Sequence, residues 1–98
     1  MPNQPATIIP SIGRTVHFVL PNGQHRPAII VRVFDEQPTP TSVANLQVFR
    51  DGSNDVPSRA PGESDMVWRT SVHQDAETMQ PGTWHSPEVV AAVEPTAV

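Results

Sequence analysis

The chain has 98 residues, which is enough for one domain and leaves no room for a second. It contains no cysteine, and this excludes both disulfide bonds and thiolate metal ligands. All six cationic side chains are arginines, and they stand against ten carboxylates, for a formal net charge of -4. Because binding to long nucleic acid depends on a basic surface, this balance argues against a nucleic-acid partner.

Two further features bear on where the protein is found. The first residues lack a basic stretch followed by an apolar run, so we expect no secretory signal peptide. The longest apolar stretch, Pro27–Val31, is far shorter than the ~20 residues that cross a membrane. Small extracellular domains usually need disulfides for stability, so we expect a soluble, cytoplasmic protein with no membrane partner.

Twelve prolines divide the chain into short segments, and strand-like runs lie between them. The first run, Thr15–Leu20, alternates between apolar side chains on one face and a second set on the opposite face. An Asn-Gly turn follows at 21–24 and predicts a tight hairpin. The next run, Ala28–Phe34, is almost continuously apolar, which predicts a central strand covered on both faces, with Pro27 at its start.

Three more strands are predicted farther along the chain. Asn45–Arg50 alternates again, with Leu46 and Val48 expected to point inward. Met66–His73 is the fourth strand and Thr83–His85 a short fifth one. No stretch repeats apolar residues at helical spacing. We therefore predict a mostly β fold, a small five-stranded antiparallel barrel that is SH3-like, with an OB-like or split barrel as the alternatives.

The same pattern predicts how the chain is organised. We expect an N-terminal extension over residues 1–11, the β-barrel domain over 12–88, and a tail over 89–98 that is flexible or forms a short helix. Both ends are expected to be flexible. Within the domain, turn-forming residues predict long loops at 51–65 and 74–82.

No catalytic motif is present. A nucleophile elbow, a phosphate-binding glycine loop and the paired-histidine zinc signature are all missing, so we do not expect an enzyme. Oxygen-bearing residues alternate in Asp51–Asp55 as in a calcium loop, but Gly62 stands where such a loop needs a glutamate, so a turn is favoured. Four histidines are scattered along the chain, and no two have ligand spacing. We predict neither a metal site nor a cofactor at these four, His17, His25, His73 and His85.

The polar faces of the strands hold residue types that bind a nucleotide. Aromatic side chains stack on bases, for about 1–3 kcal/mol per base, and arginine holds phosphate through two hydrogen bonds. We expect a tryptophan to stack, two arginines to contact phosphate, and a threonine and a histidine to contact the base or ribose. The candidate ligand-binding residues are Arg26, Trp68, Arg69, Thr70, Trp84 and His85.

Each candidate also has a structural interpretation. In so small a domain a tryptophan more often fills the core than stacks on a ligand, and the sequence gives no order between Trp68 and Trp84. Asn45 can tie down a loop, because asparagine readily bonds nearby backbone. Both interpretations stay open at the level of sequence.

Beyond these patterns, the sequence resembles a widespread set of small proteins encoded by tailed bacteriophages. The resemblance covers about residues 12–88. In relatives an aromatic residue often stands at the position of Ser86, so a pocket lined by that aromatic would be altered here. The segments that carry the resemblance are Ile12-Gly13-Arg14 with Val16-His17, Arg26-Pro27-Ala28, Asn45-Leu46-Gln47-Val48-Phe49, Asp51-Gly52, Asn54-Asp55, Trp68-Arg69-Thr70-Ser71-Val72, Pro81-Gly82-Thr83-Trp84-His85 and Pro87-Glu88.

The resemblance implies a phage accessory protein that works in the cytoplasm of the infected bacterial host. Small phage proteins of this kind include sponges of the anti-CBASS and anti-Thoeris type, which sequester the nucleotide signals of host immunity. The leading hypothesis is therefore a homo-oligomer that binds a small anionic nucleotide, such as a cyclic one. The alternative is a virion structural or decoration protein, or an SH3-like protein-binding module. A transcriptional or protein-inhibiting accessory factor is a third possibility.

Overall fold

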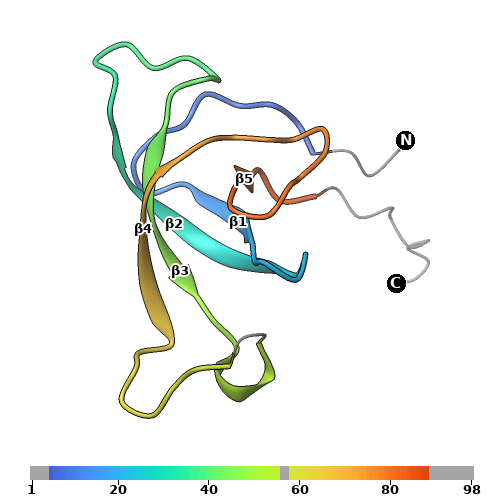
Figure 1. Ribbon diagram of the computed structural model, residues 1–98. Coiled ribbons are helices and arrows are strands. Elements are labelled where there is room, and N and C mark those ends of the chain that lie inside the picture. Colours follow the sequence, from blue (N-terminus) through green and yellow to red (C-terminus); the bar gives the residue numbers. More distant parts are fainter. Residues whose placement is uncertain (1–4, 56–57, 89–98) are drawn as a thin grey trace, which may run out of the picture.

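The computed structural model describes residues 5–55 and 58–88, and these form one five-stranded antiparallel sheet (Figure 1). The spatial order of the strands is β4-β3-β2-β1-β5. Among the described residues, one short 3-10 helix is present, η1 (Gly52–Asn54). No helix in this part of the chain is long and apolar enough to cross a membrane. The predicted mostly β, five-stranded antiparallel class is confirmed. The strands are β1 (Thr15–Val19), β2 (His25–Val33), β3 (Ala44–Phe49), β4 (Met66–Val72) and β5 (Trp84–His85).

The hairpin between β1 and β2 forms where the Asn-Gly pair predicts it. The Leu20 amide donates to the Gln24 carbonyl at 2.7 Å, and the Gly23 amide donates to the Leu20 carbonyl at 2.8 Å. Gly23 has a φ of +89°, a conformation that glycine adopts without steric cost. This turn fixes the register, so Val19 pairs with His25 and the rest of the hairpin follows.

The prediction that β2 is covered on both faces is wrong. Ala28 and Ile30 are fully buried, whereas Val31 and Arg32 on the strand are exposed. The sheet packs its core against one face of β2, so the apolar run reflects strand preference rather than burial on both sides. Pro27 lies inside β2 rather than at its start.

A bulge interrupts the pairing of β3 with β4. Leu46 pairs with Arg69, but Ala44 pairs with Val72, so β4 carries one extra residue in this interval. Ser71 lies in the bulge with a φ of +56°, which is unusual for a residue with a side chain. The regular alternation of side chains along β4 therefore ends at Arg69.

The two edges of the sheet approach each other beyond the end of β4. The Trp84 amide donates to the His73 carbonyl at 2.9 Å, and the Asp75 amide donates to the Trp84 carbonyl at 2.8 Å. Gln74 and Trp84 form an isolated parallel bridge. The chain that leaves β4 is thereby attached to β5, and the sheet curves around its core (Figure 1).

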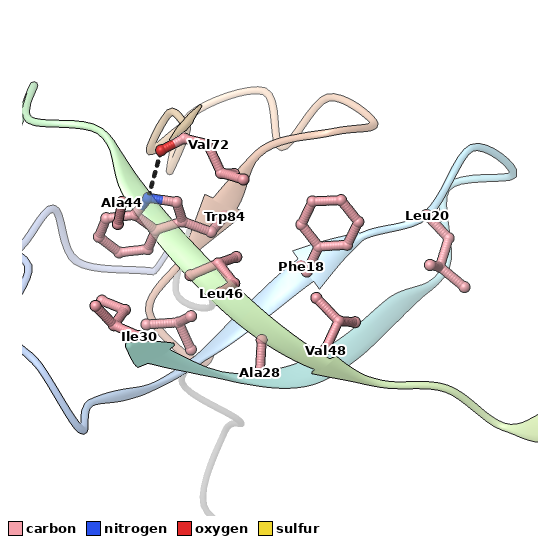
Figure 2. Packing of buried hydrophobic residues seen from close by; sticks show 10 residues of the cluster. Phe18, Leu20, Ala28, Ile30, Ala44, Leu46, Val48, Val72 and Trp84 are labelled. Atoms are coloured by element: carbon pink, nitrogen blue, oxygen red, sulfur yellow. Dashed lines mark hydrogen bonds between the residues drawn. The ribbon is translucent and has the colours of Figure 1, made fainter. Parts of the chain in front are cut away.

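Trp84 lies in that core. Its side chain is fully buried, and its indole Nε1 donates to the Val72 carbonyl at 3.2 Å (Figure 2). Figure 2 also shows Phe18 and Leu20 grouped at the end of the cluster away from the indole. The buried cluster consists of Val16, Phe18, Leu20, Ala28, Ile30, Ala44, Leu46, Val48, Val72 and Trp84.

Part of the segment predicted to be a flexible N-terminal extension is held against the sheet. The Ile8 amide donates to Gln74 Oε1 at 2.9 Å, and Gln74 Nε2 donates back to the Ile8 carbonyl at 2.8 Å. Ser86 Oγ donates to the Ala6 carbonyl at 2.7 Å. Pro10 is fully buried. The predicted C-terminal tail, residues 89–98, lies outside the described residues.

Candidate functional site

A pocket of about 290 Å³ lies between the end of β1 and the bulge of β4. The core side chains Phe18 and Leu20 form its apolar part, and the exposed residues of the bulge form its polar rim. Ligand pockets commonly combine an apolar wall with a few polar groups in this way. The lining residues are Phe18, Val19, Leu20, Pro21, Arg69, Thr70, Ser71, Val72 and Gly82.

The bulge of β4 is held in place by an asparagine of β3. The Ser71 amide donates to Asn45 Oδ1 at 3.0 Å, and Asn45 is buried. Asn45 therefore bonds backbone, as the sequence interpretation proposed, but it holds the neighbouring strand rather than a loop. Bulges often redirect side chains next to binding sites, and here the bulge brings Arg69 and Thr70 to the same pocket.

Arg69 is the cationic residue among the pocket-lining residues. Its Nη1 donates to the neighbouring Trp68 carbonyl at 3.0 Å. No carboxylate among the described residues pairs with this guanidinium. Three other arginines are paired, with the carboxylates of Asp55, Glu63 and Asp65. An arginine without a carboxylate partner keeps its donors available for an anionic ligand.

The two tryptophans have different environments, although the sequence does not indicate which of them fills the core. Trp84 fills the core, so its ring has no free face on which a base could stack. Trp68 is 53% exposed, but it points to the opposite face of β4 from the neighbouring Arg69, since side chains alternate along a strand. The structure therefore does not bring either tryptophan together with the pocket.

Arg26, a predicted phosphate contact, is engaged by a buried carboxylate. Its Nε donates to Asp55 Oδ1 at 2.8 Å, and Nη2 contacts the same oxygen. Burial alone would raise the pKa of Asp55, but the bond from Arg26 and a bond from the Asp51 amide hold that pKa below its usual range. Arg26 thus serves the fold by pairing the hairpin with the turn after β3, and it is not directed to the pocket.

His85, the last predicted contact, lies in a cluster of three histidines and one glutamate. One ring nitrogen of each histidine contacts the Glu88 carboxylate: Nδ1 of His17 and Nδ1 of His25 at 2.5 Å, and Nε2 of His85 at 3.0 Å. The ring centroids lie 4.8 to 6.2 Å apart in edge-on arrangements. The sequence interpretation that the histidines are scattered is therefore wrong for three of the four.

Electrostatics in this cluster follow from burial and shared hydrogen bonds. Burial lowers the pKa of His85 and outweighs the opposing effect of Glu88. Burial would raise the pKa of Glu88, but its own backbone amide and the imidazoles of His85 and His17 lower the pKa to about 2. The Nδ1 atom of His85 is buried without a hydrogen-bond partner among the described residues. An unsatisfied buried polar atom costs about 1–3 kcal/mol, so stability alone does not account for this histidine.

A signal for part of the cluster is present in the sequence. The hairpin turn sets the register of β1 on β2, which makes His17 and His25 diagonal neighbours on one face. His85 joins them only because β5 pairs with β1, where it lies directly opposite His17. That pairing is non-local, and the spacing of residues along the chain gives no indication of it.

Comparison with known proteins found no match: no protein-family model matches the chain, and no curated protein or solved structure shows significant similarity to it.

Proposed function

We propose that the protein binds a small anionic nucleotide in the pocket beside the β4 bulge and sequesters it rather than transforming it. The observation that carries the proposal is Arg69, which has no carboxylate partner among the described residues and lies on the rim of a partly apolar pocket. Thr70 and Ser71 supply hydroxyl groups beside it, which suit ribose or base edges. In a phage-infected bacterium, such binding would withhold a cyclic nucleotide signal from host antiviral defence.

The size of the pocket supports a specific mode of binding. Its volume of about 290 Å³ is at the lower end of the ~300–1,000 Å³ of ligand sites. One chain therefore accommodates a single nucleotide unit, and a cyclic di- or trinucleotide needs pockets from more than one subunit. We therefore propose that the protein is a homo-oligomer.

A second pocket suits an anion less well. It has a volume of about 210 Å³ and lies between the N-terminal segment and the chain that follows β4. Asp75 and Glu77 line it without a cation, so a phosphate there would meet like charge. We therefore place the ligand at Arg69.

The experiment is a thermal-shift screen of the full chain against cyclic di- and trinucleotides and cyclic ADP-ribose isomers. A ligand at 100 times its Kd adds ~2.7 kcal/mol, which raises the Tm of a domain of this size by about 10–20 °C. Size-exclusion chromatography with light scattering reports the oligomer. A flat screen from folded protein would contradict the proposal.

Variants locate the binding site. Arg69→Ala should weaken binding of the active nucleotide by about 1.5–3 kcal/mol, the cost of a lost charged hydrogen bond. Arg59→Ala is the matched control, because it removes the same charge from an exposed pair with Asp65 outside the pocket. Equal affinities for both variants in calorimetry would remove Arg69 from the site.

A second candidate function is protein binding, as in a virion component or adaptor. The observation that favours it is an exposed apolar strip on the outer face of β3 and β4. Phe49 pairs with Met66 across the strands, and Trp68 follows on the same face of β4. They are 39%, 46% and 53% exposed, respectively. Exposed apolar groups of this kind are typical of contacts between proteins.

This alternative has its own test. A structural protein should be detected by mass spectrometry in purified phage particles, and Trp68→Gln should lower its incorporation. A sequestering protein should be absent from the particles and made early in infection. The Arg69→Ala variant should leave incorporation unchanged, so the two functions are separable.

A further inference from the structure

We propose that His17, His25, His85 and Glu88 form a binding site for a divalent transition-metal ion, with Zn²⁺ as the ion that the ligand set suits best. The four residues each offer one donor atom, and these atoms lie within 4.8 Å of one another. The site lies apart from the residues that line the nucleotide pocket and is independent of the proposed function.

The backbone places the donors before any ion arrives. His17 and His85 are directly opposite each other on β1 and β5, and His25 begins β2 immediately after the hairpin turn. All three side chains therefore leave one face of the sheet. Glu88 follows β5 by three residues and extends its carboxylate over that face. Donors fixed by strand pairing need little further ordering to bind an ion.

The spacing of the donors is close to that of a tetrahedral centre. Bonds of about 2.0–2.2 Å to nitrogen and oxygen place neighbouring ligand atoms about 3.3 Å apart. His85 is fully buried and fixed, whereas the side chains of His17, His25 and Glu88 are 31%, 28% and 23% exposed. The imidazole nitrogens lie 2.5 to 3.0 Å from the Glu88 oxygens, so rotations of these three side chains would widen the contacts to Glu88 as an ion enters. Their exposure also gives the ion a path from solvent.

The chemistry of the donors selects the ion. Imidazole nitrogens suit zinc, copper, iron and nickel, whereas Mg²⁺ and Ca²⁺ require oxygen ligands. Three neutral imidazoles and one carboxylate together carry one negative charge, which lowers the net charge of the site with Zn²⁺ bound. Four protein ligands complete a tetrahedral site, which is the arrangement of structural zinc rather than catalytic zinc.

The ion would act as a cross-link. It would join β1, β2 and β5 to the segment that carries Glu88, and this chain has no disulfide to do so. Such a link would add to the modest stability that the core of a small domain provides.

The test uses the full chain without an affinity tag, stripped of metal with a chelator and checked by mass spectrometry. Titration calorimetry with ZnCl₂ should give one ion per chain. Zn²⁺ at 100 times its Kd should raise the Tm by about 10–20 °C. Co²⁺ should give the visible absorption of a four-coordinate centre with nitrogen and oxygen ligands.

Variants identify the ligands. His25→Ala and Glu88→Gln should each weaken Zn²⁺ binding by at least about 100-fold, since loss of a ligand exceeds the 10–100-fold loss from altering a group that only orients one. His73→Ala is the matched control, because this exposed histidine is outside the cluster and should leave the affinity unchanged. His85→Ala is avoided because the residue is fully buried and its loss can unfold the chain.

Two results would overturn the proposal. One is the absence of Zn²⁺ binding by the stripped, folded chain. The other is an affinity that His73→Ala reduces as much as His25→Ala does. Arg69→Ala should not change Zn²⁺ affinity, so a failed metal site and a failed nucleotide pocket give different patterns of results.

Discussion

The arginines show how neighbours decide the role of one residue type. Arg26 and Arg69 have the same side chain, and both lie on strands. Arg26 meets Asp55, which is 2% exposed, and is committed to the fold. Arg69 has no carboxylate partner among the described residues and lines a pocket. The difference comes from which loop reaches each guanidinium, and only the second arginine is available to a ligand.

The Arg26–Asp55 pair gives a prediction about stability. Arg26→Ala should lower the free energy of unfolding by about 3 kcal/mol, because it leaves a buried carboxylate without its cation. Urea denaturation measures the change. Arg26→Ala combined with Asp55→Ala should recover part of the loss. A single variant as stable as the parent would show that the pair is not formed.

The Asn45–Ser71 bond gives a second prediction at this scale. Asn45→Ala should lower the free energy of unfolding by about 1–3 kcal/mol, because the Ser71 amide loses its acceptor in the bulge. Nucleotide affinity should fall with it, since the bulge sets the position of Arg69. Gln47→Ala on the other side of Leu46 is the control and should change stability by less than about 0.5 kcal/mol. Equal effects of both variants in denaturation experiments would contradict this account.

Among the elements, the loop from β4 to β5 does the most to complete the fold. Asp75 organises it: Oδ1 accepts the Thr78 amide at 3.0 Å, Oδ2 accepts the Thr78 hydroxyl at 2.6 Å, and Oδ2 also accepts the Gln80 amide at 3.2 Å. The loop then delivers Trp84 to the core and His85 to the histidine cluster. The hydrogen bonds within this loop thus help to position Trp84 on the core face of the sheet and His85 on the opposite face.

Asp75 predicts a dependence of stability on pH. The bonds from Thr78 lower the pKa of Asp75 from 3.8 to about 2, so between these values the unfolded chain binds more protons than the folded one. Its contribution is therefore complete above about pH 5 and is lost as the pH falls towards about 2. Because the group is partly exposed, we expect the loss to be about 1 kcal/mol.

Asp75→Asn should remove this component. The difference in free energy of unfolding between the parent chain and Asp75→Asn, measured by urea denaturation, should shrink as the pH is lowered from 5 to about 2. Glu77→Gln, a nearby exposed change outside these hydrogen bonds, should show no such trend. A constant difference for Asp75→Asn across this range would contradict the assignment.

At the scale of the whole molecule, a small domain without disulfides depends on contacts between distant segments. The N-terminal residues bond to the chain after β4 through Gln74, and Ser86 bonds to Ala6 near the start. The Arg26–Asp55 pair ties the hairpin to the turn after β3. These contacts all join parts of the sequence that are far apart. They add to the modest stabilisation that the core of a small domain provides.

Removal of residues 1–10 tests the contribution of the N-terminal segment. The deletion takes away the buried Pro10, the partly buried Ile8 and two bonds to Gln74, so the free energy of unfolding should fall by about 2–3 kcal/mol. Gln74→Ala removes these two bonds and the bond from Gln74 Nε2 to the Pro40 carbonyl but leaves Ile8 and Pro10 in place, so it should cost about 1–2 kcal/mol. An unchanged midpoint in urea for the deletion would show that the segment is not held in solution.

Local patterns in the sequence determined the strands and most of their faces. The alternation of Thr15–Leu20, the Asn-Gly turn and the inward positions of Leu46 and Val48 were all predicted, because each depends on residues a few positions apart. Arg69 and Thr70 were predicted as site residues and do share a pocket. The function of that pocket remains a proposal.

Tertiary structure alone decided which residues meet across the sheet. It placed Trp84 in the core and Trp68 on the surface, and it inserted a bulge into β4. It also brought His85 and Glu88 to His17, from opposite ends of the domain. The physical reason is that β5 pairs with β1, a contact whose free energy depends on closing a long chain segment and on packing one shared core, neither of which is written in the spacing of residues.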